Sequence, residues 1–273
     1  MIRKGIVGLG GLAAGRSRYI RAVAAVARIG AVYASGLRSG DRAACHRRGA
    51  DILVALCRRN GAFWVKAAQF FSCRPDVLPL EYIEAFQQLQ NDAQPVPFPL
   101  IEKALRRSWG SDWRQQFAWL EETPVAVASI AQVHRAQLKD GRDVAIKVRL
   151  PGVKKVFEQD AKVFQAVAAL VAPTFREFDL QQAIEQLLIM TAMELDFRNE
   201  AANTLRFSRQ PHHERIRIPD IIEGLCGESV LVTSWEGGQR LRNYLDTHPE
   251  KAQDLLGVLL TSYLQQVTRF GVY

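Results

Sequence analysis

Lys147 is the residue of this 273-residue chain whose setting most directly suggests chemistry. It lies in the run Asp143 to Val148 (DVAIKV), and the β-branched residues of this run, with the Asp-Gly pair before it, predict an antiparallel strand. A lysine among apolar strand neighbours is half-buried, and a buried ammonium group needs a negatively charged partner. That partner is a carboxylate or a ligand phosphate, unless the lysine simply reaches solvent at the strand edge.

A loop of small residues lies just upstream of this strand. Protein kinases place a V-A-I-K strand lysine on the α- and β-phosphates of ATP, where a helix glutamate orients it, and cover the phosphates with a glycine-rich loop. Here residues 124–131, between two candidate strands, are mostly alanine, valine and serine. Alanine does not adopt the positive φ of glycine cheaply, so the loop predicts a phosphate cradle of a different shape.

The elements that must position these residues form an α+β pattern. Helical periodicity fills residues 41–116, with breaks at Asn60-Gly61, at 74–76 and in the proline-rich segment 91–99. Strands are predicted at 117–121, 130–138, 143–148, 217–222 and 229–234, and helices at 100–109, 153–171, 179–207 and 240–270. The helix from Asp179 has an N-cap candidate and one apolar stripe, formed by Leu180, Ile184, Leu187, Leu188, Thr191 and Leu195.

Positive charge is concentrated in the first 60 residues, which contain 12 Lys or Arg and two acids, whereas the whole chain carries +8. The remaining residues are close to neutral, so no nucleic-acid partner is expected. Residues 18–37 are amphipathic, with Ile20, Val23, Ala27, Ala31 and Ala34 at helical spacing. Three interpretations stay open: a helix on an anionic membrane surface, an organellar transit peptide, or a solvated helix packed on the domain.

Composition excludes several classes of protein. The chain is 48% hydrophobic and 23% charged, which argues against disorder and fibrous structure. Its four cysteines have no C-x-x-C spacing, so we expect reduced thiols and neither a zinc site nor a disulfide framework. No apolar run reaches about 18 residues, so no transmembrane helix is expected. The expected location is the cytoplasm, with peripheral binding at the inner membrane as the alternative.

Four blocks of sequence resemble the UbiB/AarF/ADCK group of atypical kinase-like proteins, which is linked to ubiquinone biosynthesis. They are VKAAQFFSCRPDVLPLEYIEAFQQLQ at 65–90, PVAVASIAQVHRAQLKDGRDVAIKV at 124–148, ELDFRNEAAN at 194–203 and LVTSWEGG at 231–238. The resemblance implies a kinase-like N-lobe, made of a five-stranded antiparallel sheet plus helices, with a helical N-terminal extension and the first helices of a C-lobe. It divides the chain into a basic segment (1–50), the extension (51–116), the N-lobe (117–236) and the start of a truncated C-lobe (237–273).

The resemblance assigns residues to an ATP or ADP site. The alanine-rich loop corresponds to Ala126 through Ala131, with Val127 where the family has alanine, and Thr233 to Trp235 correspond to the hinge that meets adenine. Glu194 of the E-x-D motif is the preferred partner of Lys147, with Glu200 as the fallback. The implied cofactor-binding residues are Ala126, Val127, Ala128, Ser129, Ala131, Lys147, Glu194, Thr233 and Trp235. His134, on the strand after the loop, is expected to be structural.

A second motif implies regulation. The K-x-G-Q motif of the family corresponds to Lys66-Ala67-Ala68-Gln69, on a helical extension that in the family folds over the kinase-like site. Lys66 and Gln69 are therefore regulatory candidates, and Asp196 is expected to face Lys66. Alanine at position 68 adds a Cβ where the family has glycine.

The family's catalytic loop, H-x-D-P-H-P-G-N, and its D-F-G-type motif are absent from this sequence. Phosphoryl transfer needs the metal ligands and the positioning group that these motifs supply. We therefore assign no catalytic residue and no metal ligand, and expect magnesium dependence only if a partner chain supplies the missing C-lobe. The implied function is the ATP-binding half of a UbiB-type kinase or ATPase in ubiquinone biosynthesis, inactive in phosphoryl transfer alone. The alternative is a non-catalytic module that binds a nucleotide or a prenyl-quinone lipid at a membrane surface.

Overall fold

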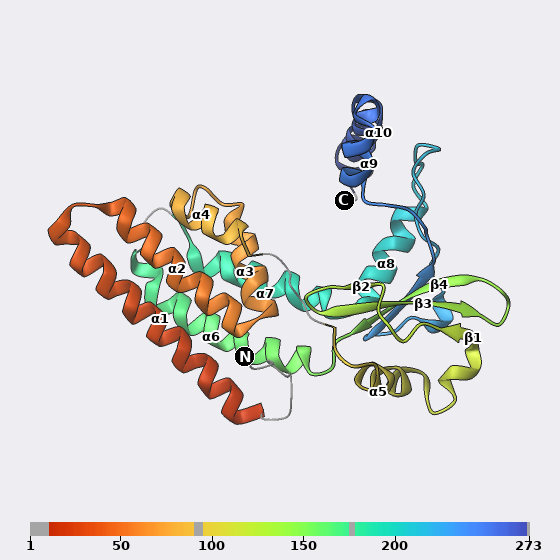
Figure 1. Ribbon diagram of the computed structural model, residues 1–273, viewed down its shortest axis with the longest axis horizontal. Helices are drawn as coiled ribbons and strands as arrows, with labels where there is room; N and C mark the ends of the chain where they lie inside the picture. The colour runs from red at the N-terminus through yellow and green to blue at the C-terminus, as the bar shows by residue number, and fades with distance from the viewer. Residues whose placement is uncertain (1–10, 90–94, 175–177, 272–273) are drawn as a thin grey trace. The chain divides into compact units, whose positions relative to one another are not determined.

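The computed structural model describes residues 11–89, 95–174 and 178–271, and the chain divides into two compact units. Unit 1 comprises Met1–Ile101, Ala126–Gln132 and Arg149–Leu195, and unit 2 comprises Glu102–Val125, Val133–Val148 and Asp196–Tyr273. The combination of a helical unit with a unit that carries a sheet confirms the α+β class (Figure 1).

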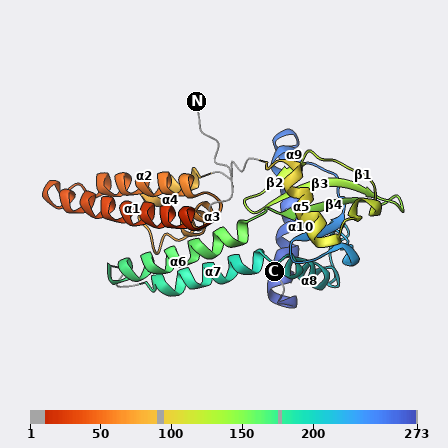
Figure 2. The ribbon, with the colours of Figure 1, turned by 90° about the horizontal axis from the view of Figure 1, so that it is seen from below.

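Unit 1 is built from helices that share one apolar core. They are α1 (Gly11–Ser39), α2 (Arg42–Asn60), α3 (Ala62–Ser72), α4 (Leu80–Gln87), α6 (Val153–Val171) and α7 (Leu180–Glu194). Helix α1 packs on α2 and α6, and α6 packs on α7, as Figure 2 also shows. Trp64, Phe86 and Leu187 belong to the buried core between them. Asp41 caps α2 through Ala44 N at 2.9 Å, and the predicted break at Asn60-Gly61 is confirmed.

Helix α1 is tied to its neighbours by a buried ion pair. Arg18 donates to both carboxylate oxygens of Asp160 on α6 at 2.7 Å, and the Asp160 side chain is fully buried. Arg18 also donates to the carbonyl of Asn60, and Arg21 donates to Asn60 Oδ1 at 2.9 Å. One face of α1 is therefore packed on the other helices of unit 1.

The helix predicted from Asp179 to about Phe207 is two helices. Asp179 caps α7 through Gln182 N at 2.9 Å, and the predicted stripe of α7 is buried as expected. The helix ends at Glu194, and α8 (Phe197–Ser208) begins after Asp196, whose side chain accepts from Arg198 N. The prediction of one helix is wrong because the N-cap at Asp196 interrupts an otherwise periodic segment.

The sheet has the order β1-β3-β4-β5, and β2 pairs with β3. Its strands are β1 (Phe117–Leu120), β2 (Ala126–Val127), β3 (Ala131–Leu138), β4 (Asp143–Arg149) and β5 (Val230–Ser234). The prediction of a strand at 217–222 is wrong, because only an isolated bridge from Ile221 to Thr233 forms there. Pro219 has no backbone N–H to give to a ladder. The fifth strand is β2, which the sequence analysis missed.

Aromatic residues join the end of the fifth helix to the first strand of the sheet. Helix α5 (Phe98–Trp109) leads to a 3₁₀ turn (Trp113–Gln116). In unit 2, the rings of Trp109, Trp113 and Phe117 pack with centroids 5.5–6.3 Å apart. Aromatic packing of this kind stabilises the start of β1 beyond the burial of area alone.

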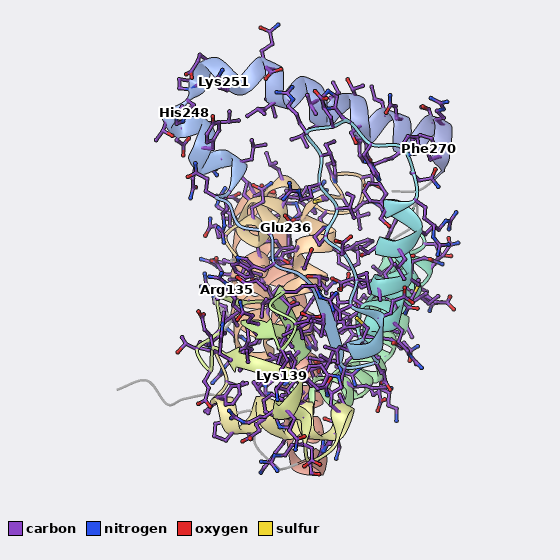
Figure 3. All side chains as sticks on the ribbon, turned by 90° about the vertical axis from the view of Figure 1, so that its right-hand side faces the viewer. Arg135, Lys139, Glu236, His248, Lys251 and Phe270 are labelled. Atoms are coloured by element: carbon purple, nitrogen blue, oxygen red, sulfur yellow. The ribbon has the colours of Figure 1, made fainter. Side chains whose placement is uncertain are left out.

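The end of unit 2 is helical and exposes apolar side chains. It consists of α9 (Leu241–Thr247), a 3₁₀ turn (Pro249–Lys251), α10 (Ala252–Gln265) and a π turn (Gln266–Phe270), with His248 and Phe270 near opposite ends in Figure 3. The exposed large apolar residues of α10 and the π turn are Leu256, Leu259, Leu260, Tyr263, Leu264 and Val267. None of the helices among the described residues has the length and hydropathy that crossing a membrane requires.

Candidate functional site

Lys147 lies near the middle of β4 and forms an ion pair with Glu200, in which its ammonium group donates hydrogen bonds to both carboxylate oxygens. Strand alternation buries Val144 and Ile146 completely and leaves Lys147 on the other face with 29% of its side chain exposed. Its Nζ lies 2.8 Å from Glu200 Oε1 and 2.7 Å from Oε2. The ammonium group also lies 5.0 Å from the ring centroid of Phe197. The lysine is therefore held at a defined point and remains accessible.

The helix break at Asp196 provides this partner. Phe197 and Glu200 are three residues apart in the first turns of α8, so they share one face of the helix. Both contact Lys147 from that face. The preferred pairing of Lys147 with Glu194 is therefore wrong, and the fallback partner Glu200 is confirmed.

Glu194 instead pairs with Lys66, and both residues belong to unit 1. Lys66 lies on α3 and Glu194 is the last residue of α7. Asp196, which belongs to unit 2, caps α8 and its carboxylate binds Arg198 Nη2 at 2.6 Å, and the expectation that it faces Lys66 of unit 1 stays a prediction. Lys66 of the K-x-G-Q-like motif and Glu194 of the E-x-D motif thus form an ion pair with each other, whereas Glu194 was predicted to pair with Lys147.

The other positions of the K-x-G-Q-like motif, Gln69 and Ala68, make contacts within unit 1. Gln69 donates to the carbonyl of Leu89 at 3.2 Å, which ties α3 to the segment after α4. Ala68 is 3% exposed and belongs to the core of unit 1, so its Cβ packs among apolar neighbours. Lys66 and Ile130 line one small cavity of about 20 Å³. Lys66 therefore lies near Ile130 of the alanine-rich segment within unit 1.

The alanine-rich loop is a tight turn between β2 and β3. Ala128 N donates to Ala131 O at 2.8 Å, and Leu150 N donates to Ile130 O at 2.8 Å. Ala131 is completely buried, whereas Ala126 and Ala128 are exposed and Val127 and Ser129 are half-buried. The loop residues belong to unit 1 and Lys147 to unit 2, so the contact of this loop with phosphates stays a prediction.

Two buried polar residues of β3 support the framework. The Gln132 side chain accepts from Val96 N and donates to Val96 O, which anchors the proline-rich segment. His134 is 1% exposed, and its Nδ1 lies 2.9 Å from the carbonyl oxygen of Glu121. Burial lowers the pKa of His134, so its imidazole is neutral at pH 7. These contacts agree with the structural role expected for His134.

The hinge residues already use several of their backbone groups. Thr233 pairs with Ala145 across the β4–β5 ladder. Ser234 N donates to Asp220 O at 2.8 Å, and Trp235 N donates to Asp143 O at 3.0 Å. Both of these backbone donors at the expected hinge are therefore occupied within the protein.

The Trp235 side chain is also engaged. Its ring lies 5.1 Å from the guanidinium of Arg135, which lies 5.7 Å from the ring of Trp119. Arg135 is fixed in turn by Asp143 at 2.6 Å. In Figure 3, Arg135 lies on the sheet strands of unit 2. The indole therefore stacks on an arginine, a contact that sequence spacing does not reveal.

Within the described ranges, no group of three or more His, Cys, Asp or Glu side chains could hold a metal ion. Sequence reasoning gave Glu200 only as the fallback partner of Lys147 and did not name Phe197, yet both contact Lys147. The signal that could have found them is the spacing of three residues directly after Asp196, a residue type that favours a helix N-cap, which places both on the first turns of a helix.

Comparisons with known proteins identify the family of this chain. Residues 88–273 match the model of the ABC1 atypical kinase-like domain, so the chain belongs to that family, and the resemblance to the UbiB/AarF/ADCK group is confirmed. The chain is 32% identical over 254 residues to the "uncharacterized protein in hydrogenase 1 5′region" of Clostridium pasteurianum, covering 91% of this chain and 48% of that protein.

Animal relatives carry kinase names. The chain is 32% identical to "AarF domain-containing protein kinase 1" of Xenopus laevis, covering 80% of this chain and 43% of that protein. Against the mouse protein of the same name, the identity is 30%, with 82% and 45% covered. The chain thus spans about half the length of the curated relatives it matches.

A solved structure is also similar. It is titled "The complex structure of Rv3197-erythromycin from Mycobacterium tuberculosis", with a TM-score of 0.48 and 33% sequence identity. The match covers 62% of this chain and 44% of that one.

Proposed function

We propose that this chain binds ATP or ADP through Lys147. The observation that carries the proposal is the contact of Lys147 Nζ with both carboxylate oxygens of Glu200. In protein kinases, a strand lysine oriented by a helix glutamate holds the α- and β-phosphates of ATP. Membership of an atypical kinase family supports the same role here. The exposed 29% of the Lys147 side chain leaves the ammonium group open to a phosphate.

Because the backbone N–H groups of the expected hinge are already used within the protein, we place the adenine contact at the residues that follow. Ser234 N and Trp235 N already donate to Asp220 O and Asp143 O, so they are poor donors for a base. The segment 236–238 follows at once and contains two glycines, and Gly238 has a φ of 145°. We assign the adenine contact to the backbone of this segment. Thr233 and Trp235 then support the hinge from the sheet.

The experiment is a thermal shift with ATP and with ADP. We expect the wild-type chain to show a nucleotide-dependent rise in Tm, and Lys147→Ala to abolish it. Lys139→Ala is the matched control, because Lys139 is an exposed lysine in the turn between β3 and β4 (Figure 3). An equal shift in Lys147→Ala and wild type would refute the phosphate role of Lys147. Absence of any shift in wild type would refute nucleotide binding.

We propose that this chain does not transfer a phosphoryl group by itself. The sequence contains neither H-x-D-P-H-P-G-N nor D-F-G, and these motifs bring the positioning group and the metal ligands in the family. We propose that magnesium-dependent transfer requires a further polypeptide segment that supplies a C-lobe. The exposed apolar face of α10 fits such a segment, since exposed stripes of this size mark contact surfaces. Magnesium-dependent ATP turnover by the purified chain alone would contradict this.

Family membership suggests the metabolic pathway in which the protein acts. We propose that the protein supports the biosynthesis of ubiquinone or of a related prenyl-quinone. This proposal depends on family membership and not on any residue contact. The test is the quinone content of source cells in which the protein is deleted and then restored. Unchanged quinone levels after deletion would refute the role.

A second candidate function, a lipid-binding module at a membrane surface, is favoured by the exposed face of α1. Ile20 is 56% exposed and Val23 is 39% exposed, and Ala27, Ala31 and Ala34 lie exposed on the same predicted stripe. The packed face of α1 is a different one, where Ala22 and Ala25 are buried. A basic helix with an outward apolar stripe is suited to an anionic bilayer surface, with a prenyl-quinone lipid as a further candidate ligand.

Flotation with vesicles tests the membrane proposal. We expect binding to phosphatidylglycerol vesicles, weak binding to phosphatidylcholine vesicles, and loss of binding in Ile20→Asp/Val23→Asp. Ile189→Asp is the matched control, because Ile189 is a 46% exposed apolar residue on α7 of the same unit. Equal flotation of the double variant and wild type would refute a role for the α1 stripe.

A further inference from the structure

The segment 217–222 braces the end of β5 within unit 2, although it does not form the predicted strand. In addition to its isolated bridge, Ile222 N donates to Val232 O at 2.9 Å, and Ser234 N donates to Asp220 O at 2.8 Å. These backbone contacts run along β5 and end at Ser234, the last residue of the strand. The brace therefore supports the chain at the point where it leaves the sheet.

The Ser234 hydroxyl connects this brace to Glu236, which Figure 3 labels. The Ser234 Oγ accepts from Asp220 N at 3.0 Å and donates to Glu236 Oε1 at 3.1 Å. The other carboxylate oxygen, Glu236 Oε2, accepts from Arg217 Nη1 at 3.2 Å. Arg217 keeps 81% of its side chain exposed, and exposed ion pairs contribute little, so Ser234 is the main support of Glu236.

The backbone that follows Glu236 is costly to order. Gly237 and Gly238 come next, and Gly238 has a φ of 145°, a conformation that residues with a side chain rarely adopt. Glycine loses more conformational freedom on ordering than any other residue. A ligand that binds to such a segment must supply the free energy of ordering, unless the protein orders the segment beforehand. The bonded carboxylate of Glu236 holds the segment at its first residue.

We propose that Ser234 is a positioning residue for the nucleotide: its hydroxyl fixes Glu236, and Glu236 holds the backbone of 236–238 ready for the adenine. This inference rests on the proposed nucleotide site, in which 236–238 contact the adenine and Lys147 holds the phosphates. Ser234 is in register with Val144, and Lys147 is three residues further along β4, a distance of about 10 Å. The effect of Ser234 is therefore confined to the base and does not reach the phosphates.

Two ligands separate the base from the phosphates. ATP carries both groups, whereas tripolyphosphate carries the phosphates alone, and isothermal titration calorimetry gives the dissociation constant of each. We expect Ser234→Ala to weaken ATP about three- to tenfold and to leave tripolyphosphate within about twofold of wild type. Ser234→Thr keeps the hydroxyl on a residue that suits a strand end, so it should bind ATP as wild type does. Lys147→Ala should weaken both ligands.

Ser229→Ala is the matched control. Ser229 precedes β5 at its other end, and its Oγ lies 3.0 Å from Ser108 Oγ, so this variant also loses a serine hydroxyl contact and should bind both ligands as wild type does.

Wild-type affinity of a folded Ser234→Ala for ATP would overturn the inference, as would equal weakening of ATP and tripolyphosphate. If Ser234→Ala does not fold, Glu236→Ala decides by the same comparison. If tripolyphosphate does not bind wild type, equal ATP affinities of Ser234→Ala and Ser234→Thr overturn the inference. Absence of ATP binding to wild type would refute the proposed nucleotide site, and the inference with it.

Discussion

The ion pair of Arg18 with Asp160 predicts a large loss of stability when only one partner is removed. The Asp160 carboxylate is fully buried and accepts from Arg18 Nε and Nη2 at 2.7 Å each. Arg18→Met keeps much of the apolar stem and removes both donors. The carboxylate then remains buried on α6 without its cation, a state that is strongly unfavourable.

The magnitude follows from that burial. Breaking a buried ion pair by removing one partner costs about 3–5 kcal/mol, whereas exposed pairs are worth about 0–1 kcal/mol. Arg18 keeps only 14% of its side chain exposed, so this pair belongs with the buried ones. In a chain of this size, we expect Tm to fall by about 10 °C. Arg28→Met, an exposed arginine on the same helix, should change the free energy of unfolding by less than about 0.5 kcal/mol.

Urea unfolding followed by circular dichroism measures these values in a double-mutant cycle. The double variant Arg18→Met/Asp160→Leu removes the orphaned charge and should recover most of the free energy lost in Arg18→Met. A loss below about 1 kcal/mol in Arg18→Met would refute the reasoning. Simple addition of the two single effects would show that the pair is not coupled.

Three further predictions concern local contacts within the two units. Asp196→Ala removes the N-cap of α8 and should cost about 1 kcal/mol in urea unfolding, and an unchanged midpoint would contradict the capping role. Burial lowers the pKa of His134 below its ordinary 6.5, so the unfolded chain takes up the proton first and stability should fall as pH drops below about 6.5. His134→Gln should flatten this slope between pH 8 and 5.5, whereas the same slope in the variant would assign it to another group. Gly49→Ala should cost about 1–3 kcal/mol, because a Cβ there would collide with the hydroxyl of the buried Tyr82, and a wild-type Tm would show that Tyr82 gives way freely.

Local sequence patterns predicted most of the framework. The strands around 117–121, 130–138 and 143–148 follow from alternation and from the Asp140-Gly141 turn, where Gly141 has a φ of 90°. The cap at Asp179 and the buried stripe of α7 depend only on neighbours in sequence, and both are as predicted. The position of Lys147 on β4 belongs to the same class of result.

Features that depend on distant partners were not predictable from these patterns. The segment 217–222 has strand-like residues, yet Pro219 leaves it with a single bridge to β5. Periodicity across Asp179 to Phe207 conceals the stop at Leu195, because the residues beyond it continue the apolar spacing. The pairing of lysines with glutamates follows from that stop, so the sequence analysis assigned the preferred pair wrongly.

The short break between α7 and α8 explains why two glutamates close in sequence contact two different lysines. In one continuous helix, Glu194 and Glu200 would lie about 120° apart around the same axis, because each residue turns the helix by about 100°. Here each belongs to its own helix, so Glu194 binds Lys66 in unit 1 and Glu200 binds Lys147 in unit 2. The break is supported from both sides, since Arg149 donates to the carbonyl of Leu195 and Asp196 caps α8. Arg149 ends the strand that carries Lys147, so one strand both presents the proposed phosphate ligand and supports the break that supplies its partner.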